Sequence, residues 1–335
     1  IFREHNFDVS ASNLPYVNYG QPLDSDFYSK RGIQVEKIIG RYTNKYIYEV
    51  LGLDEYSDPI QFDALLRRNL FMLAMLETSI FTFRDIIYQN GKYWSTTDYT
   101  ANSGVPKSVI DNYTALYYLP HITKITDGGR GTLTIMINDL THDPAYLQYP
   151  NYTVVEKTTD QGKNFFGNDS FKYYHVNSAS YILLAKWFDY LREAEIWDNT
   201  RIIIVSDHGD GGITHPDFSA FQNNHVLPYN SILLFKDFGS NEPLKTNNDF
   251  MTTADVPFLA MKDIVENQIN PFTGNPLMPD KEDGIYIFTE GRTNTSFYTG
   301  TTCLEDNSKF FHVHDSIFDS GNWTELKYKD FKDKK

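Results

Sequence analysis

The chain has 335 residues, of which 41% are hydrophobic and 22% are charged, which is the balance of a folded globular protein and excludes wholesale disorder. Its formal net charge of −14 opposes binding to nucleic acid, and no run of about 18 apolar residues is present that could span a membrane. The single cysteine, Cys303, excludes an internal disulfide framework and a zinc site built from several thiolates. We therefore expect one large domain or two ordinary ones, with no nucleic-acid partner.

The first third of the chain predicts one strand and several helices. Residues 7–10 alternate like a short strand, whereas the rest of the segment 1–60 is rich in Tyr, Asn, Asp and Pro and has little helical periodicity. Between residues 59 and 88, apolar side chains recur mostly at three- and four-residue steps, which predicts one long helix or two short ones. A further helix is expected over residues 107–118.

Three apolar runs farther along predict buried strands, at residues 132–137, 201–205 and 228–235. Helices are expected between and after them, at residues 170–194 and 254–265. Alternating strands and helices are typical of an α/β fold with a largely parallel sheet. Residues 285–288 and 310–314 predict a small antiparallel annex at the C-terminus. We therefore predict a partial α/β domain over residues 1–282 and a strand-rich extension of it over 283–335.

The most informative polar segment follows the strand 201–205. In open α/β sheets, functional residues lie just beyond the carboxyl ends of the strands. There, Ser206-Asp207-His208-Gly209 places a carboxylate next to an imidazole, a combination that suits Zn²⁺ or Mn²⁺, and the glycines after it let the backbone approach an anionic ligand. The alternative is a simple turn, in which Asp207 caps a local amide and His208 packs against it.

Other histidines are weaker candidates. His142 follows the strand 132–137 and His225 precedes the strand 228–235, so both could contact a ligand at strand ends. The alternatives are a loop histidine that caps Asp139, for His142, and a histidine that closes a turn, for His225. His312 and His314 lie on one face of a predicted strand. They could be two metal ligands, for which no third ligand is nearby. The alternative is that both side chains face solvent.

Several of these segments together resemble a known superfamily. An apolar strand running into Ser206-Asp207-His208-Gly209 resembles the metal-binding signature of the alkaline-phosphatase superfamily. The helix closing on Trp197-Asp198-Asn199-Thr200, the strand ending in Thr141-His142-Asp143-Pro144 and the segment 228–234 are similar to its sulfatase-like branch. That branch includes sulfatases, phosphoethanolamine transferases and lipoteichoic acid synthases, and the resemblance covers most of the chain.

The resemblance implies an alkaline-phosphatase-like fold and a specific chemistry. Asp207 and His208 would hold a divalent metal (Mn, Zn, Mg or Ca), and His142 and His225 would contact an anionic, lipid- or glycan-linked ester. In this superfamily the nucleophile and the first acidic metal ligand lie near the start of the domain. Sulfatases use a Cys or Ser in a Cys/Ser-x-Pro-x-Arg motif, which Cys303 does not match, and the transferases use a Thr that opens a helix.

We find no counterpart of that nucleophile upstream of Asp207. The resemblance therefore implies the carboxyl-terminal part of a membrane-anchored bacterial protein, with this domain outside the cytoplasm and its metal incompletely ligated. The primary hypothesis is part of an enzyme that hydrolyses or transfers a phosphodiester, phosphoglycerol or sulfate ester, with phosphoglycerol or phosphoethanolamine transfer favoured over sulfatase action. The alternative is a non-catalytic binding or regulatory module with the same fold. We also predict that the strands ending at Ile137 and Val205 are central and parallel, which would bring His142, Asp207 and His208 to one edge of the sheet.

Overall fold

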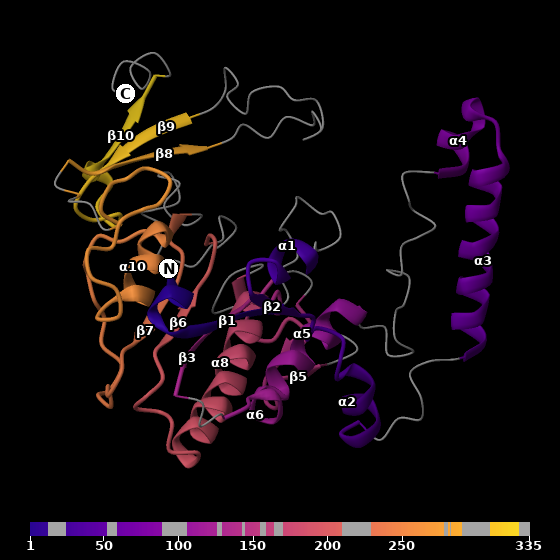
Figure 1. Ribbon diagram of the computed structural model, residues 1–335, viewed down its shortest axis with the longest axis horizontal. Helices are drawn as coiled ribbons and strands as arrows, with labels where there is room; N and C mark the ends of the chain where they lie inside the picture. The colour runs from indigo at the N-terminus through magenta and orange to yellow at the C-terminus, as the bar shows by residue number, and fades with distance from the viewer. Residues whose placement is uncertain are drawn as a thin grey trace. The chain divides into compact units, whose positions relative to one another are not determined.

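The computed structural model describes residues 1–12, 25–51, 59–88, 106–125, 129–142, 145–154, 159–163, 170–209, 229–277, 281, 283–289 and 309–327 (Figure 1). The chain forms two compact units. The first comprises Ile1–Phe166 and Phe171–Ala194, and the second comprises Gly167–Ser170 and Glu195–Lys335. No helix within the described ranges is long and apolar enough to cross a membrane.

A parallel sheet of three strands organises the first unit. The strands are β1 (Phe7–Ser12), β2 (Ile33–Glu36) and β3 (Gly131–Met136), in the order β2-β1-β3. Val9 is in register with Ile33 on one side and with Leu133 on the other, and both pairings are parallel. The carboxyl ends of all three strands therefore meet at one edge, where the segments after Glu36 and Met136 begin. The prediction of an α/β protein with a parallel sheet is confirmed at this level.

The helices of the first unit agree with the sequence prediction where the periodicity is strong. The predicted helices at 59–88 (as two), 107–118 and 170–194 are confirmed as α3, α4, α5 and α8, whereas the helices before residue 50 were not predicted. A short antiparallel pair, β4 (Leu147–Gln148) with β5 (Thr153–Val154), completes this unit. The helical segments are η1 (Phe2–His5), α1 (Ser25–Ser29), α2 (Thr43–Glu49), α3 (Pro59–Thr78), α4 (Phe81–Tyr88), α5 (Lys107–Tyr117), α6 (Leu119–Ile122) and α8 (Ser170–Glu193).

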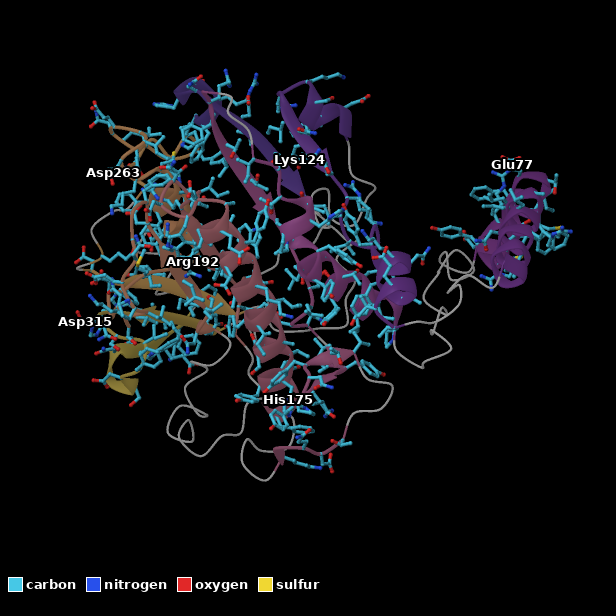
Figure 2. The ribbon with its side chains drawn as sticks, turned by 90° about the horizontal axis from the view of Figure 1, so that it is seen from below. Glu77, Lys124, His175, Arg192, Asp263 and Asp315 are labelled. Carbon is cyan, nitrogen blue, oxygen red and sulfur yellow. The ribbon has the colours of Figure 1, made fainter. Side chains whose placement is uncertain are left out.

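The core of the first unit lies where α2, α5 and α8 bury apolar residues at helical spacing. Three- and four-residue steps place side chains on one face of a helix, and each of these helices contributes such a face. His175 of α8, labelled in Figure 2, is also buried, and its Nε2 lies 3.0 Å from the carbonyl oxygen of Gln161. The buried cluster includes Tyr46, Ile47, Val109, Ile110, Tyr113, Leu116, Val176, Ala179 and Leu183.

The described residues of the second unit form two small antiparallel sheets. β6 (Ile202–Val205) pairs with β7 (Leu233–Lys236), and the chain continues through η5 (Thr253–Asp255) and α10 (Val256–Met261). The strands β8 (Ile285–Thr289), β9 (Lys309–Val313) and β10 (Trp323–Leu326), with η6 (Ser320–Asn322) before the last, form the other sheet in the order β10-β9-β8 (Figure 1). Both of its pairings are antiparallel, which confirms the predicted C-terminal annex.

The prediction that the strands ending at Ile137 and Val205 are central and parallel does not hold for the described ladders. β6 pairs antiparallel with β7 in a two-stranded sheet, and β3 stands at the end of the order β2-β1-β3. β3 is also not buried on both faces, since Ile135 is 48% exposed. An apolar run shows that a strand has a covered face, but not which strand lies beside it.

Candidate functional site

A threonine opens a helix at the carboxyl edge of the parallel sheet. Helix α2 begins at Thr43, seven residues after β2 ends at Glu36. Thr43 is 1% exposed, and its Oγ1 donates a hydrogen bond to Oδ1 of Asp111 in α5 at 2.5 Å. Gly40, at φ 82°, lets the connecting loop pass this carboxylate: a Cβ there would lie 3.2 Å from Oδ2 of Asp111.

The loop that carries His142 is held by the next residue of α5. Oδ1 of Asn112 accepts a hydrogen bond from the backbone N–H of Asp139, and its backbone oxygen accepts one from Nδ2 of Asn138, both at 2.9 Å. Leu140 is buried in the core, so the loop is fixed at both points. The His142 backbone N–H donates to the carbonyl of Asp139 at 3.1 Å, while its side chain is exposed.

Two adjacent residues of α5 thus hold two polar segments at the carboxyl edge. Asp111 fixes Thr43, and Asn112 fixes the loop that leads to His142. This edge is where open α/β sheets place ligand sites. Thr43, Asp111 and His142 are therefore the candidate functional residues of the first unit.

The second unit presents the predicted metal signature at the end of β6. The backbone N–H of Ser206 donates to the carbonyl of Ile232 at 3.1 Å, and Oγ of Ser206 accepts from the N–H of Ile232 at 3.0 Å. These reciprocal bonds extend the β6–β7 pairing by one residue. They fix the backbone from which Asp207 and His208 project.

Asp207 and His208 place a carboxylate oxygen beside an imidazole nitrogen. Nδ1 of His208 lies 2.6 Å from the carbonyl oxygen of Gly209, which can only accept, so Nδ1 carries the proton and the neutral ring has its lone pair on Nε2. Oδ2 of Asp207 lies 3.7 Å from that Nε2, and a backbone partner on the other ring nitrogen is typical of metal-bound histidine.

The exposure of the Asp207 and His208 side chains distinguishes a ligand site from a simple capped turn. Oδ1 of Asp207 accepts from the backbone N–H of His208 at 2.9 Å, so the expected local cap is present. His208 does not pack, however: its side chain is 69% exposed and that of Asp207 is 88% exposed. These two groups are accessible to a ligand and contribute little to the core. The donor set fits a Zn²⁺ or Mn²⁺ ion in kind, but it is smaller than the three or four protein ligands of a usual zinc site.

The described residues supply no third metal ligand beside Asp207 and His208. Across the described ranges, no group of three or more His, Cys, Asp or Glu side chains is placed to hold a metal. His225 lies outside the described residues. His142 belongs to the first unit and the Asp207–His208 pair to the second, so their shared site stays a prediction.

The histidines of the C-terminal annex are engaged with their own neighbours. The ring centroids of His312 and His314 lie 6.1 Å apart. Nε2 of His312 lies 2.5 Å from the carbonyl of Asp283, and Nδ1 of His314 lies 2.8 Å from Oδ2 of Asp315. Neither contact supplies a third ligand that the two histidines share. We therefore assign no metal to this sheet.

Sequence analysis did not single out Thr43 or Asp111. The available signal was short: Tyr46 and Ile47 follow a polar helix start, and both are buried in the core. No sequence pattern singled out Asp111, because it becomes a candidate only through its hydrogen bond with Thr43, 68 positions away in the chain. Comparison of the chain with models of protein families, with curated proteins and with solved structures finds no match.

Proposed function

We propose that this chain is the metal- and anion-binding part of a sulfatase-like protein with an alkaline-phosphatase-like fold. Its action would be to hydrolyse or transfer a phosphodiester, phosphoglycerol or sulfate ester at the bacterial cell surface. The observation that carries this proposal is the Asp207–His208 pair. It follows strand β6, it is exposed, and it places Oδ2 of Asp207 3.7 Å from Nε2 of His208.

The proposed roles follow from the chemistry of each side chain. Asp207 and His208 would hold the divalent cation. A bound cation would acidify the nucleophilic hydroxyl and stabilise charge on the oxygens of the reacting ester. His142 and His225 would contact the anionic ester, and His142 stands in a loop anchored by Asn112 with its side chain exposed. Phosphoglycerol or phosphoethanolamine transfer is favoured because the His142 loop resembles that of the transferases.

The metal assignment predicts weak but site-specific cation binding. Titration of the chain with Mn²⁺ or Zn²⁺, followed by calorimetry, is expected to give an affinity that falls at least about tenfold in Asp207→Ala and in His208→Ala, since each change removes a ligand. Asp315→Ala is the matched control, because Asp315 is also exposed and lies 2.8 Å from the neighbouring His314. Equal loss in the control, or no loss in Asp207→Ala, would contradict the assignment.

The same samples test the enzymatic role. With only Asp207 and His208 as ligands, the chain is expected to give no turnover of a chromogenic phosphodiester or sulfate ester when Mn²⁺ or Zn²⁺ is present. Turnover that Asp207→Ala abolishes would show that the site is complete in these residues. That result would support the enzyme and contradict incomplete ligation.

A non-catalytic binding module is the second candidate, and two observations favour it. The hydroxyl of Thr43, the threonine that opens a helix, is buried and bonded to Asp111. Strand β1 ends in Ser10-Ala11-Ser12, so none of the last three residues of this strand is acidic. In this candidate Thr43 ties α2 to α5 and takes no part in chemistry.

Two substitutions measure that structural role. Thr43→Val keeps the shape but removes the donor to the Asp111 carboxylate, so we expect the free energy of unfolding to fall by about 1–3 kcal/mol. Thr43→Ser keeps the hydroxyl and is expected to cost less than about 1 kcal/mol. Urea denaturation measures both. A Thr43→Val variant as stable as the wild type would rule out this anchoring role.

A further inference from the structure

The α3–α4 hairpin carries more apolar surface than the contact between its two helices covers. On α3, Asn69, Met72, Leu73 and Leu76 are half-buried at three- and four-residue spacing, which is typical of a face that meets a partner helix, and α4 packs against α3. At 100° per residue, Leu70, Phe71, Ala74 and Met75 form a second apolar stripe on another side of α3, and all four are exposed. A helix that is apolar on both sides is usually buried on both.

The exposed apolar side chains are large enough in total to form an interface. With about 200 Å² for a phenylalanine side chain, the three phenylalanines of the hairpin expose roughly 400 Å², and the exposed aliphatic side chains contribute a similar area. Summed over α3, α4 and the turn between them, this area of roughly 800 Å² is comparable to the share of one partner in a standard interface, and the stripe on α3 supplies only part of it. The side chains are Leu70 (57% exposed), Phe71 (63%), Met75 (42%), Ile80 (66%), Phe81 (87%), Phe83 (54%) and Ile86 (68%).

Charge favours a second copy of this chain as the occupant. The hairpin, residues 59–88, holds three arginines (Arg67, Arg68 and Arg84) against three acidic residues (Asp63, Glu77 and Asp85), so it has no net charge in a chain of −14. Two copies therefore repel each other less here than over the chain on average. An anionic lipid surface, by contrast, would be opposed by the net charge of the whole protein.

We propose that the hairpin is a self-association surface, on which α3 packs antiparallel against α3 of a second copy. A twofold axis between residues 72 and 73 makes the exposed stripe complementary to itself, as a symmetric dimer requires. Phe71 then faces the small Ala74 of the second copy, and Leu70 faces Met75. The same register brings Arg67 within about one residue, or 1.5 Å along the axis, of the level of Glu77 in the other copy. Glu77 is labelled on α3 in Figure 2.

Sedimentation equilibrium of the full chain tests this surface. We expect a concentration-dependent dimer, and a dissociation constant at least about 100-fold higher in the double variant Leu70→Glu, Phe71→Glu. Both positions are exposed in the single copy, so the variant is expected to keep the circular dichroism of the wild type. Phe272→Glu is the matched control: Phe272 is 95% exposed but lies outside the hairpin, and its change should leave the dimer intact.

Charge reversal tests the antiparallel direction. Arg67→Glu and Glu77→Arg should each weaken the dimer, and the combination should restore it. A wild-type chain that stays monomeric up to about 100 µM would overturn the proposal. Its dissociation constant would then be higher than that of a typical specific interface. Binding of the hairpin to phosphatidylcholine vesicles without self-association would also overturn it, because the apolar stripe would then have a lipid partner.

Discussion

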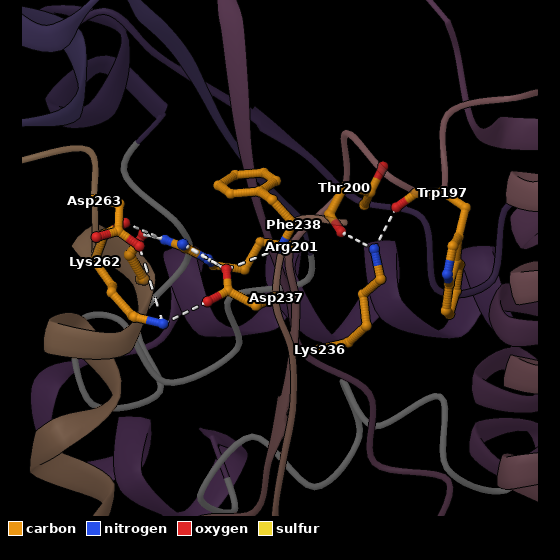
Figure 3. Close-up of polar contacts among 9 residues, drawn as sticks. Trp197, Thr200, Arg201, Lys236, Asp237, Phe238, Lys262 and Asp263 are labelled. Carbon is orange, nitrogen blue, oxygen red and sulfur yellow. Dashed lines mark hydrogen bonds and ion pairs between the residues drawn. The ribbon is translucent and has the colours of Figure 1, made fainter. Parts of the chain in front are cut away.

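Replacement of Asp237 by Asn is expected to be the most damaging polar substitution in the second unit. Arg201 precedes β6 and Asp237 follows β7, so the antiparallel pairing brings them together at one end of the two strands (Figure 3). Oδ1 of Asp237 accepts from Nη2 of Arg201 at 2.6 Å, and Oδ2 accepts from Nζ of Lys262 at 2.7 Å. The Arg201 side chain is only 6% exposed, so an amide at position 237 would leave a buried cation without its anion.

The size and pH dependence of this effect follow from the pKa of Asp237. Burial alone would raise that pKa, but the hydrogen bonds from Lys262 and Arg201 outweigh burial and lower it from 3.8 to about 2. Such a shift corresponds to about 2 kcal/mol of stability. Because the pKa is lower in the folded chain, this stabilisation is complete above about pH 4 and is lost as the pH falls towards 2.

Thermal unfolding at several pH values measures the prediction. At pH 7 we expect Asp237→Asn to lower the free energy of unfolding by about 2–3 kcal/mol and the midpoint by about 5–10 °C. Between pH 4 and 2 the difference from wild type should shrink. Asp263→Asn is the control, since Asp263 is exposed and lies 3.9 Å from the same Lys262. If both variants lose the same stability, the buried ion cluster does not hold β6 in place.

Contacts at both ends of β6 hold the strand that presents Asp207 and His208. Asp207 follows the carboxyl end of β6, whereas Arg201 stands before its first residue. The ion cluster anchors one end of a four-residue strand, and the Ser206–Ile232 bonds anchor the other. The exposed Asp207 and His208 contribute little to packing, so the strand that presents them is held by these other contacts.

The elements that could be predicted from the sequence are those with a strong local pattern. Helix α8 was predicted almost to its ends, because Ser170–Glu193 repeats apolar residues at helical spacing. Strand β6 was predicted because Ile202–Val205 is an unbroken β-branched run. Helix α2 was missed, since Thr43–Glu49 is short, polar and aromatic, and its burial depends on α5, far along the chain.

The candidate site shows the same division. Asp207 and His208 could be found because they are adjacent in sequence and follow a recognisable strand. The link between Thr43 and Asp111 could not be found, since it joins residues from two helices. The direction of β6 was also beyond prediction, because an apolar run fixes neither the neighbour nor the orientation of a strand.

The largest loss in the first unit is expected for Tyr46→Ala. Tyr46 of α2 is 1% exposed, and its ring lies 5.3 Å from that of Tyr113 and 5.1 Å from that of Tyr117, both in edge-to-face contact. Removal of a buried aromatic ring costs about 3–5 kcal/mol, most of it from the cavity that remains. Since α2 begins at Thr43, this change should also loosen the threonine that α2 positions, measured as faster amide hydrogen exchange in residues 43–49.

The hydroxyl groups of this cluster add a pH-dependent term with a definite sign. Burial raises the pKa of the Tyr46 and Tyr113 phenols above the usual 10.0. The folded chain therefore keeps both protons when the unfolded chain begins to lose them. The stabilisation is complete below about pH 10 and is lost as the pH rises further, the reverse of the Asp237 case.

A pair of conservative variants separates the ring from its hydroxyl. Tyr46→Phe keeps the ring and removes one buried hydroxyl, so we expect a loss of at most about 1.5 kcal/mol at pH 7, smaller than that of Tyr46→Ala. The double variant Tyr46→Phe, Tyr113→Phe removes both phenols, so it should lose less stability than wild type between pH 9 and 11. Urea denaturation at pH 7 and between pH 9 and 11 measures the free energy of unfolding of all three variants. An alkaline loss in the double variant as large as in wild type would show that other groups control it, because neither buried phenol would remain to ionise.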